Sequence, residues 1–303
     1  MNKRILQAPT ELYQKMPTWL VAILTPVMVE GFFIIGSVLF GIIFGLSAVF
    51  FIIVNGNFDA FTEGVTLPLH VELLSFSFVS GLLFMWVKWV EKRPISSLGF
   101  FKNNWFKELA LGFLVGSLQF SLALGLVYLL GGVEVSGVDV SSTTWLYVLS
   151  TIPFWLIQGG TEELLTRGWL LPILNKRTNL AIAVGISSSL FGLMHLANDH
   201  VTFLSVLSII LSGVTMALYM LKRDNLWGVI GLHGAWNFVQ GNIYGVAVSG
   251  QGAGSSIFHF VEKAGAPEWI SGGGFGTEGS LMASLVELLF IAYLYYGVKK
   301  EKA

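Results

Sequence analysis

Long apolar segments separated by short polar ones dominate the chain, and eight of them are long enough to cross a bilayer. A spanning helix needs about 20 mostly apolar residues at 1.5 Å of rise each. The predicted spans are residues 31–54, 67–90, 106–130, 150–174, 180–197, 203–221, 226–248 and 281–298. This pattern predicts an all-α fold, a polytopic membrane bundle of eight transmembrane helices.

The first apolar segment begins before the first predicted span. Residues 19–26 are also apolar, and a single helix over residues 19–54 would contain 36 residues, or about 54 Å of helix. That length exceeds the thickness of one bilayer core. We therefore expect residues 19–26 to form a separate interfacial segment that ends near Pro26.

The composition restricts the class of protein. Hydrophobic residues make up 54% of the chain and charged residues 12%, where soluble domains have about 25% charged residues. The mean hydropathy is +0.73, which excludes a soluble cytosolic enzyme. A net charge of -1 gives no field that would attract nucleic acid. The absence of cysteine excludes thiol catalysis and cysteine-ligated metals.

The basic residues predict the orientation of the bundle. With the spans above, every lysine and arginine except Lys263 falls on one side of the membrane. Because cytoplasmic loops are enriched in Lys and Arg, both termini are expected in the cytoplasm. Short termini, compact loops and the lack of an organelle signal favour a multi-pass protein of a bacterial plasma membrane.

The chain divides into two parts of different character. Residues 1–145 hold the interfacial segment and three spans, and we interpret their isolated Glu30 and Glu72 as boundary or structural groups. Residues 146–303 hold five spans and most of the polar residues within spans. The glycine-rich loop at residues 249–279 is expected to be flexible or lightly packed.

Ionisable side chains inside spans are costly and usually functional, and here they concentrate in three of the eight spans. Glu163 and Arg167 are four residues apart and can pair on one helix face, while Glu162 is rotated by about 100°. His233 and Asn237 are also four residues apart. The candidates are Glu162, Glu163, Arg167, Phe191, His195, His233 and Asn237.

These residues fall at depths that let them meet. Counting the helical rise from the basic ends places them in the inner or middle part of the bilayer, in a pocket expected to open toward the cytoplasm. A carboxylate and a neutral imidazole can deprotonate a water, and a second imidazole with a carboxamide can donate to an oxyanion. This set suits amide hydrolysis. The alternative is a catalytic zinc held by two histidines and a glutamate, namely Glu162, His195 and His233.

Three motifs in this order resemble the CPBP family of intramembrane proteases, the CAAX prenyl protease 2, Rce1-like or Abi group. They are Glu162-Glu163-x-x-x-Arg167, Phe191-x-x-x-His195 and His233-x-x-x-Asn237, and the resemblance covers about residues 150–245. It implies an eight-helix bundle in which Glu162 and His195 activate water. It further implies that His233 and Asn237 form the oxyanion hole.

The resemblance implies an intramembrane endopeptidase that acts on a membrane-associated peptide or protein. Glu163, Arg167 and Phe191 are assigned supporting roles. We favour a mechanism without a cofactor, because Asn237 is a poor zinc ligand but a good donor; zinc is the alternative. Besides the substrate and the bilayer, no partner or oligomeric state is indicated.

Two functions of other classes compete with proteolysis. A proton-coupled transporter would use the same glutamates and histidines as a relay, but such proteins commonly have repeated halves, and the polar residues lie in one half here. A non-proteolytic scaffold or immunity protein could retain the fold, although the intact motifs argue against it.

Overall fold

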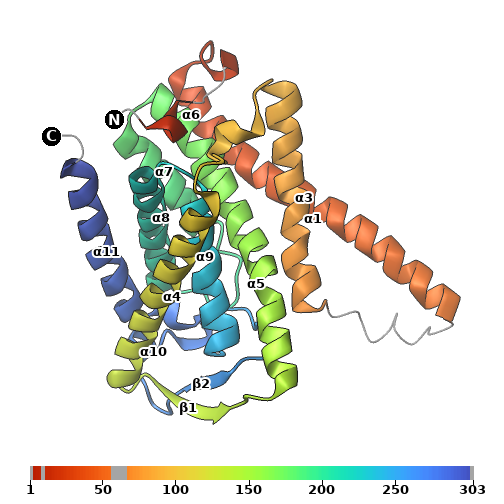
Figure 1. Ribbon diagram of the computed structural model, residues 1–303, viewed down its shortest axis with the longest axis vertical. Helices are drawn as coiled ribbons and strands as arrows, with labels where there is room; N and C mark the ends of the chain where they lie inside the picture. The colour runs from red at the N-terminus through yellow and green to blue at the C-terminus, as the bar shows by residue number, and fades with distance from the viewer. Residues whose placement is uncertain (1–2, 8–10, 56–66, 301–303) are drawn as a thin grey trace.

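The computed structural model describes residues 3–7, 11–55 and 67–300 and shows a mostly helical bundle (Figure 1). The longer helices after the first are α3 (Leu69–Met85), α4 (Trp105–Leu129), α5 (Ser142–Glu163), α7 (Leu180–Leu193), α8 (Phe203–Arg223), α9 (Trp227–Phe238) and α11 (Leu281–Lys300). The shorter helical turns are η1 (Arg4–Leu6), η2 (Glu11–Tyr13), η3 (Trp86–Val90), η4 (Ile95–Leu98), α6 (Leu171–Arg177), α10 (Glu268–Ser271), η7 (Gly273–Phe275) and η8 (Thr277–Gly279).

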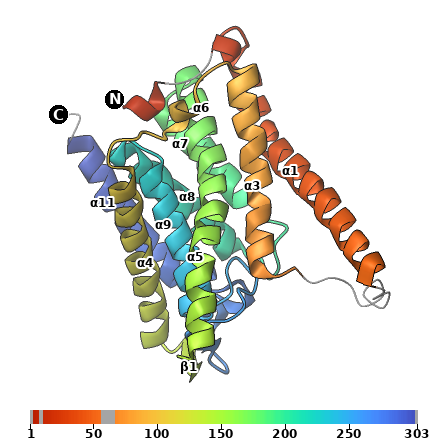
Figure 2. The same cartoon turned by 45° about the vertical axis from the view of Figure 1, so that its right-hand side comes forward.

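The first helix, α1, runs without a break over Thr18–Asn55 and includes Pro26. The predicted interfacial segment that ends near Pro26 is therefore wrong. Proline removes one backbone hydrogen bond. Membrane helices tolerate this loss because neighbouring helices, side chains or small backbone adjustments satisfy the freed carbonyl group. A helix of 38 residues is about 57 Å long, and a helix longer than the bilayer is thick can tilt. Figures 1 and 2 show α1 strongly inclined to α5.

Within the described residues, five helices are long and apolar enough to cross a membrane: Thr18–Asn55, Leu69–Val90, Trp105–Leu129, Phe203–Arg223 and Leu281–Lys299. The other three predicted spans, at residues 150–174, 180–197 and 226–248, appear as shorter or interrupted helices in the bundle. Two of them, α7 and α9, contain 14 and 12 residues, which is shorter than a spanning helix. The membrane nature of the chain thus has support, while the count of eight spans stays a prediction.

Two of these interrupted helices continue into π-helical turns. The turn η5 (Leu164–Leu170) follows α5, and η6 (Val239–Ile243) follows α9. A π turn has hydrogen bonds between residues five apart, instead of four apart as in an α-helix. Such turns often occur at functional sites. Here each turn begins within two residues of a candidate, Glu163 in α5 and Asn237 in α9.

Glycines let α4 and α9 approach closely. A Cβ atom at Gly116 would lie 2.1 Å from the carbonyl oxygen of Leu232, and one at Gly112 would lie 1.8 Å from that of Gly228. Small residues four apart bring membrane helices together in this way. The contact fixes the helix that carries His233 and Asn237.

We expect Gly116→Ala to destabilise the protein by about 1–3 kcal/mol, because the added methyl group meets the backbone of α9 and overpacks the contact. Thermal unfolding of the purified protein in detergent measures the effect. The control is Gly125→Ala on the same helix, where nothing lies within 4 Å of the added methyl group. Equal losses in the two variants would contradict the packing argument.

A small antiparallel sheet, which the all-α prediction lacks, lies at one end of the bundle (Figure 1). It pairs β1 (Val133–Val138) with β2 (Phe258–Glu262) and contains an irregularity between Val135 and Gly137. The loop that contains β2 is well packed rather than loose, since Phe275 is fully buried. The Asn242 amide also donates to the carbonyls of Ala253 and Ser255.

The opposite end of the bundle, called the basic end here, holds both ends of the chain (Figure 1). Arginines there pair with carboxylates from distant segments, including Arg4 with Asp224 at 3.1 Å and Arg223 with Glu108 at 2.6 Å. The grouping of Lys and Arg at one end agrees with the sequence analysis. Which side of a membrane this end faces stays a prediction.

Candidate active site

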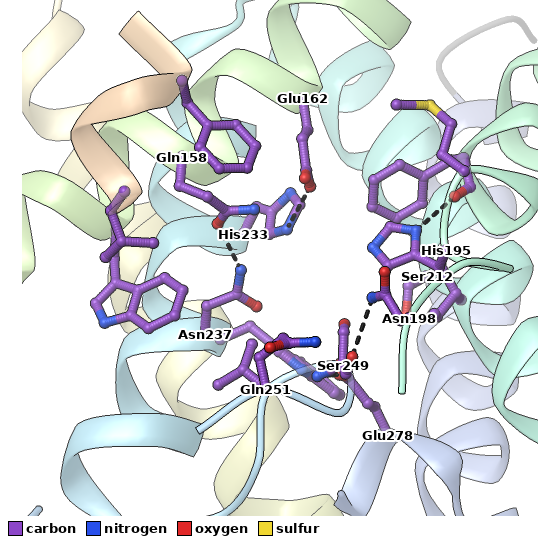
Figure 3. Close-up of a pocket in the computed structure, with 18 of the residues that line it drawn as sticks. Gln158, Glu162, His195, Asn198, Ser212, His233, Asn237, Ser249, Gln251 and Glu278 are labelled. Carbon is purple, nitrogen blue, oxygen red and sulfur yellow. Dashed lines mark hydrogen bonds and ion pairs between the residues drawn. The ribbon is translucent and has the colours of Figure 1, made fainter. Parts of the chain in front are cut away.

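One cavity of about 320 Å³ brings the candidates together. Its lining comes from α1, α3, α5, α7, α8, α9, the turn after α7 and the loop before α11. All four residues predicted to do chemistry line it: Glu162, His195, His233 and Asn237. Figure 3 shows Glu162 projecting into the space between His233 and His195. Three separate motifs thus share one polar chamber.

Glu163 and Arg167 form a fully buried ion pair behind this chamber. Arg167 Nη1 donates to Glu163 Oε1 at 3.0 Å, and both side chains have 0% exposure. The predicted pairing of these two residues is confirmed. Arg167 also donates to the Gly213 carbonyl at 3.0 Å, and its guanidinium lies 4.5 Å from the centroid of the Phe191 ring. Through these contacts the pair joins η5 to α7 and α8.

His233 lies between the two adjacent carboxylates. Its Nδ1 is 3.0 Å from Glu163 Oε1, and its Nε2 is 3.5 Å from Glu162 Oε2. Because an ionised carboxylate only accepts hydrogen bonds, Nδ1 carries a proton and donates it to Glu163. The ring is thereby held with its other nitrogen toward the cavity, beside Glu162.

His195 lies in a turn just past α7 rather than within a helix that reaches residue 197. Its Nδ1 is 2.8 Å from the Phe191 carbonyl oxygen, one of the carbonyls that a helix end leaves without a partner. The ring thus caps the end of α7 and replaces a further helical turn. Since a carbonyl can only accept, Nδ1 is the donor, and a neutral ring keeps its lone pair on Nε2.

Phe191 separates the two imidazoles. Its ring centroid is 5.0 Å from that of His195 and 5.7 Å from that of His233, with edge-to-face geometry in both pairs. A rigid apolar wall between two rings keeps them in fixed orientations. Phe191 therefore supports the geometry of the site, in agreement with its predicted position beside the cavity.

Gln158 is a site residue that the sequence analysis missed. The Asn237 amide donates to Gln158 Oε1 at 2.8 Å, and both residues line the cavity. Gln158 precedes Glu162 by four residues, so it lies on the same face of α5. That spacing was the available signal, but an amide alone is common in membrane helices.

Two glutamates interpreted as boundary or structural groups belong to the cavity instead. Glu30 of α1 and Glu72 of α3 both line it, as does Glu278, which precedes α11. Glu72 is also an exposed residue in the first turn of α3, as a boundary group would be, but the shared lining could not be predicted because it depends on the angle between α1 and α3. By contrast, Glu287 is buried and accepts from Ser212 at 3.0 Å, as a structural group would.

The mouth of the cavity lies away from the basic end. Its exposed lining residues are Glu72, Gln251 and Gly252, at the end of the bundle that carries β1 and β2. The basic end is filled by buried side chains such as Trp169 and Leu170. Apolar packing thus fills the basic end, and the predicted opening toward the cytoplasm stays a prediction, since neither end is assigned to a side of the membrane.

Hydrogen bonds of Ser249 hold the loop before α11 against the cavity. The Ser249 hydroxyl donates to Glu278 at 2.7 Å, its backbone N–H donates to the same oxygen, and its carbonyl accepts from Asn198 at 3.0 Å (Figure 3). Burial raises the pKa of the Glu278 carboxyl, while the hydrogen bonds from Ser249 oppose this effect. The hydrogen bond from Asn198 links the loop to the turn that carries His195.

The zinc alternative, which stays a prediction, requires three side chains that group as metal ligands. Among the residues that the structure describes, no three His, Asp or Glu side chains group as metal ligands would. Nδ1 of His195 and Nδ1 of His233 both contact oxygen atoms of the protein, so Nε2 is the ring nitrogen that each leaves for a ligand. Glu162, His195 and His233 surround a shared space without forming a ligand cluster.

Comparison with known proteins gives one match. Residues 143–239 match the family model described as type II CAAX prenyl endopeptidase Rce1-like. No curated protein and no solved structure matches the chain. The matched region holds α5, α7 and α9 with all the residues of the three motifs, whereas α1, α3 and the loop before α11 lie outside it.

Proposed function

We propose that this chain, which belongs to the Rce1-like family by its residues 143–239, is an intramembrane endopeptidase. It hydrolyses a peptide bond in a membrane-associated peptide or protein. The observation that carries the proposal is the convergence of Glu162, His195, His233 and Asn237 on one cavity. A carboxylate, two imidazoles and a carboxamide around one space supply both a base and donors.

Glu162 and His195 activate the attacking water. Glu162 Oε2 is buried without a hydrogen-bond partner, and His195 has its Nε2 lone pair available because Nδ1 donates to the Phe191 carbonyl. A water between the two can donate to both. As it attacks the scissile carbonyl, Glu162 takes its proton and later gives a proton to the leaving amine.

His233 and Asn237 stabilise the oxyanion that develops on the scissile carbonyl. Asn237 uses one amide hydrogen on Gln158, and the other is available to the substrate. His233 donates from Nε2 when its ring carries both protons. Glu162, Glu163 and Arg167 together carry a net charge of about -1 when ionised, which an imidazolium at His233 balances. Fixed donors of this kind stabilise the transition state because they need no reorganisation.

Glu163 and Arg167 act as positioning residues. Glu163 accepts from His233 Nδ1 and therefore sets the orientation of the ring. Arg167 neutralises Glu163 and holds it by a bond of 3.0 Å. Neither lines the cavity, so they act on the reaction through His233.

The purified protein in proteoliposomes is expected to cleave quenched fluorogenic peptides that carry an apolar segment. Because the candidate zinc ligands are not grouped, cleavage should persist in 1,10-phenanthroline at a concentration that inactivates a zinc protease assayed in parallel. Inhibition that added zinc reverses would contradict the proposed metal-free route. A folded protein that cut no peptide would favour the scaffold alternative.

A further inference from the structure

Acidic side chains outnumber basic ones in the lining of the cavity. Four of its lining residues are glutamates, namely Glu30, Glu72, Glu162 and Glu278, and its lining includes neither lysine nor arginine. Arg167 lies behind Phe191 and is paired with Glu163, so besides the His233 ring no cationic group of the described residues faces the cavity. The four carboxylates come from α1, α3, α5 and η8.

Two of these carboxylates have a polar neighbour within the protein. Glu162 faces His233 at 3.5 Å, and Glu278 accepts from Ser249. Glu30 and Glu72 differ, because neither side chain has a hydrogen bond or an ion pair with another residue in the described ranges 3–7, 11–55 and 67–300. Both lie on helices long and apolar enough to span a membrane.

A carboxylate at membrane depth is costly unless it has a partner. Glu30 is half-buried and lies about 18 Å along α1 from Thr18, counted at 1.5 Å per residue. A metal ion does not fit as the partner, since the described residues include no ligand group for one. An organic cation does fit, because the aromatic rings of Trp155 and Trp236 also line the cavity and attract cations at their faces.

An independent feature of the same space also indicates an incoming donor. Glu162 is 7% exposed, and its Oε2 makes no hydrogen bond. Figure 3 shows this carboxylate directed into the cavity. A buried acceptor without a hydrogen bond is unfavourable, and the His233 ring lies 3.5 Å away from this oxygen, so the position favours a ligand that brings hydrogen-bond donors.

Glu30 and Glu72 differ in their exposure to solvent. Glu72 is exposed, whereas Glu30 is half-buried, and both line the cavity that also holds Glu162 and His195. A cationic side chain that enters the cavity would meet both carboxylates. We propose that the cavity admits a peptide with a lysine or arginine beside the bond to be cut, and that Glu30 and Glu72 select it. This inference rests on the proposed protease function.

The test uses the full-length protein in proteoliposomes and one fluorogenic peptide frame whose residues beside the expected scissile bond are varied. Lysine, glutamine and glutamate peptides are compared by kcat/KM. Because a glutamate side chain would meet like charges where a lysine meets opposite ones, we expect the lysine peptide to exceed the glutamate peptide at least about tenfold. In the double variant Glu30→Gln/Glu72→Gln, the ratio of lysine to glutamine rates should fall toward one.

Glu134→Gln is the matched control, because Glu134 is an exposed glutamate of β1 outside the cavity lining, and it should keep the wild-type ratio. Equal wild-type rates for the three peptides would overturn the inference and leave the protease function intact. A lysine preference that survives the double variant would also overturn it.

A second measurement separates this inference from the proposed function. Binding of the lysine and glutamate peptides to a His195→Ala variant, followed by fluorescence anisotropy, requires no cleavage. Tighter binding of the lysine peptide, lost in the added Glu30→Gln/Glu72→Gln background, supports the selection even if no peptide is cut. Equal binding of the two peptides would refute it.

Discussion

Glu162→Gln is expected to lower kcat by about 10²–10⁴-fold, because the amide keeps the shape of the side chain but cannot take a proton from water. The residue is buried, and its Oε2 faces the cavity without a hydrogen-bond partner. The substitution therefore removes the base and leaves most contacts of the side chain in place. The loss should appear in peptide cleavage by purified protein. It should also appear as uncleaved precursors when membranes of wild-type and variant cells are compared.

The control for this variant is Glu134→Gln, which changes a glutamate on the exposed sheet. Both proteins should reach the membrane in equal amounts and unfold at similar temperatures. Wild-type cleavage by a folded Glu162→Gln protein would remove the central assignment of the proposed mechanism.

Arg167→Met is expected to destabilise the protein by about 3–5 kcal/mol, because it leaves Glu163 buried and without its cation. Both side chains have 0% exposure, so water cannot replace the lost partner. Denaturant or thermal unfolding in detergent would give the free energy of unfolding relative to the wild-type protein.

The double variant Glu163→Gln/Arg167→Met tests the cause of that loss. It removes both charges, so the free energy of unfolding should recover a large part of what Arg167→Met loses. Its peptidase activity should stay low, because the uncharged residue 163 no longer balances an imidazolium at His233. If the double variant were as unstable as the single one, packing rather than charge would explain the effect.

Local spacing was sufficient to predict much of the site. The pair of Glu163 and Arg167 followed from their separation of four residues, and the ordered motifs placed His195 and His233 near Glu162. These inferences succeeded because the rise and rotation of a helix are fixed by backbone geometry. They needed no knowledge of how helices pack.

The failed predictions depended on packing between distant segments. The sequence could not show that α1 continues through Pro26, or that Glu30 and Glu72 line the cavity that holds His195. It also could not show that Ser249 and Glu278 fasten a loop across the cavity. Nor could it show that Asn242 accepts from Trp155 at 2.6 Å and anchors that loop. Each outcome depends on angles between helices, which local patterns leave undetermined.

The cavity is built from two sources within one chain. The groups proposed to do chemistry come from residues 143–239, whereas Glu30, Glu72 and Glu278 come from flanking segments outside that region. The two sets can consequently change independently during evolution. A lineage can acquire new targets by altering its first helices or the loop before α11, while the hydrolytic apparatus stays as it is.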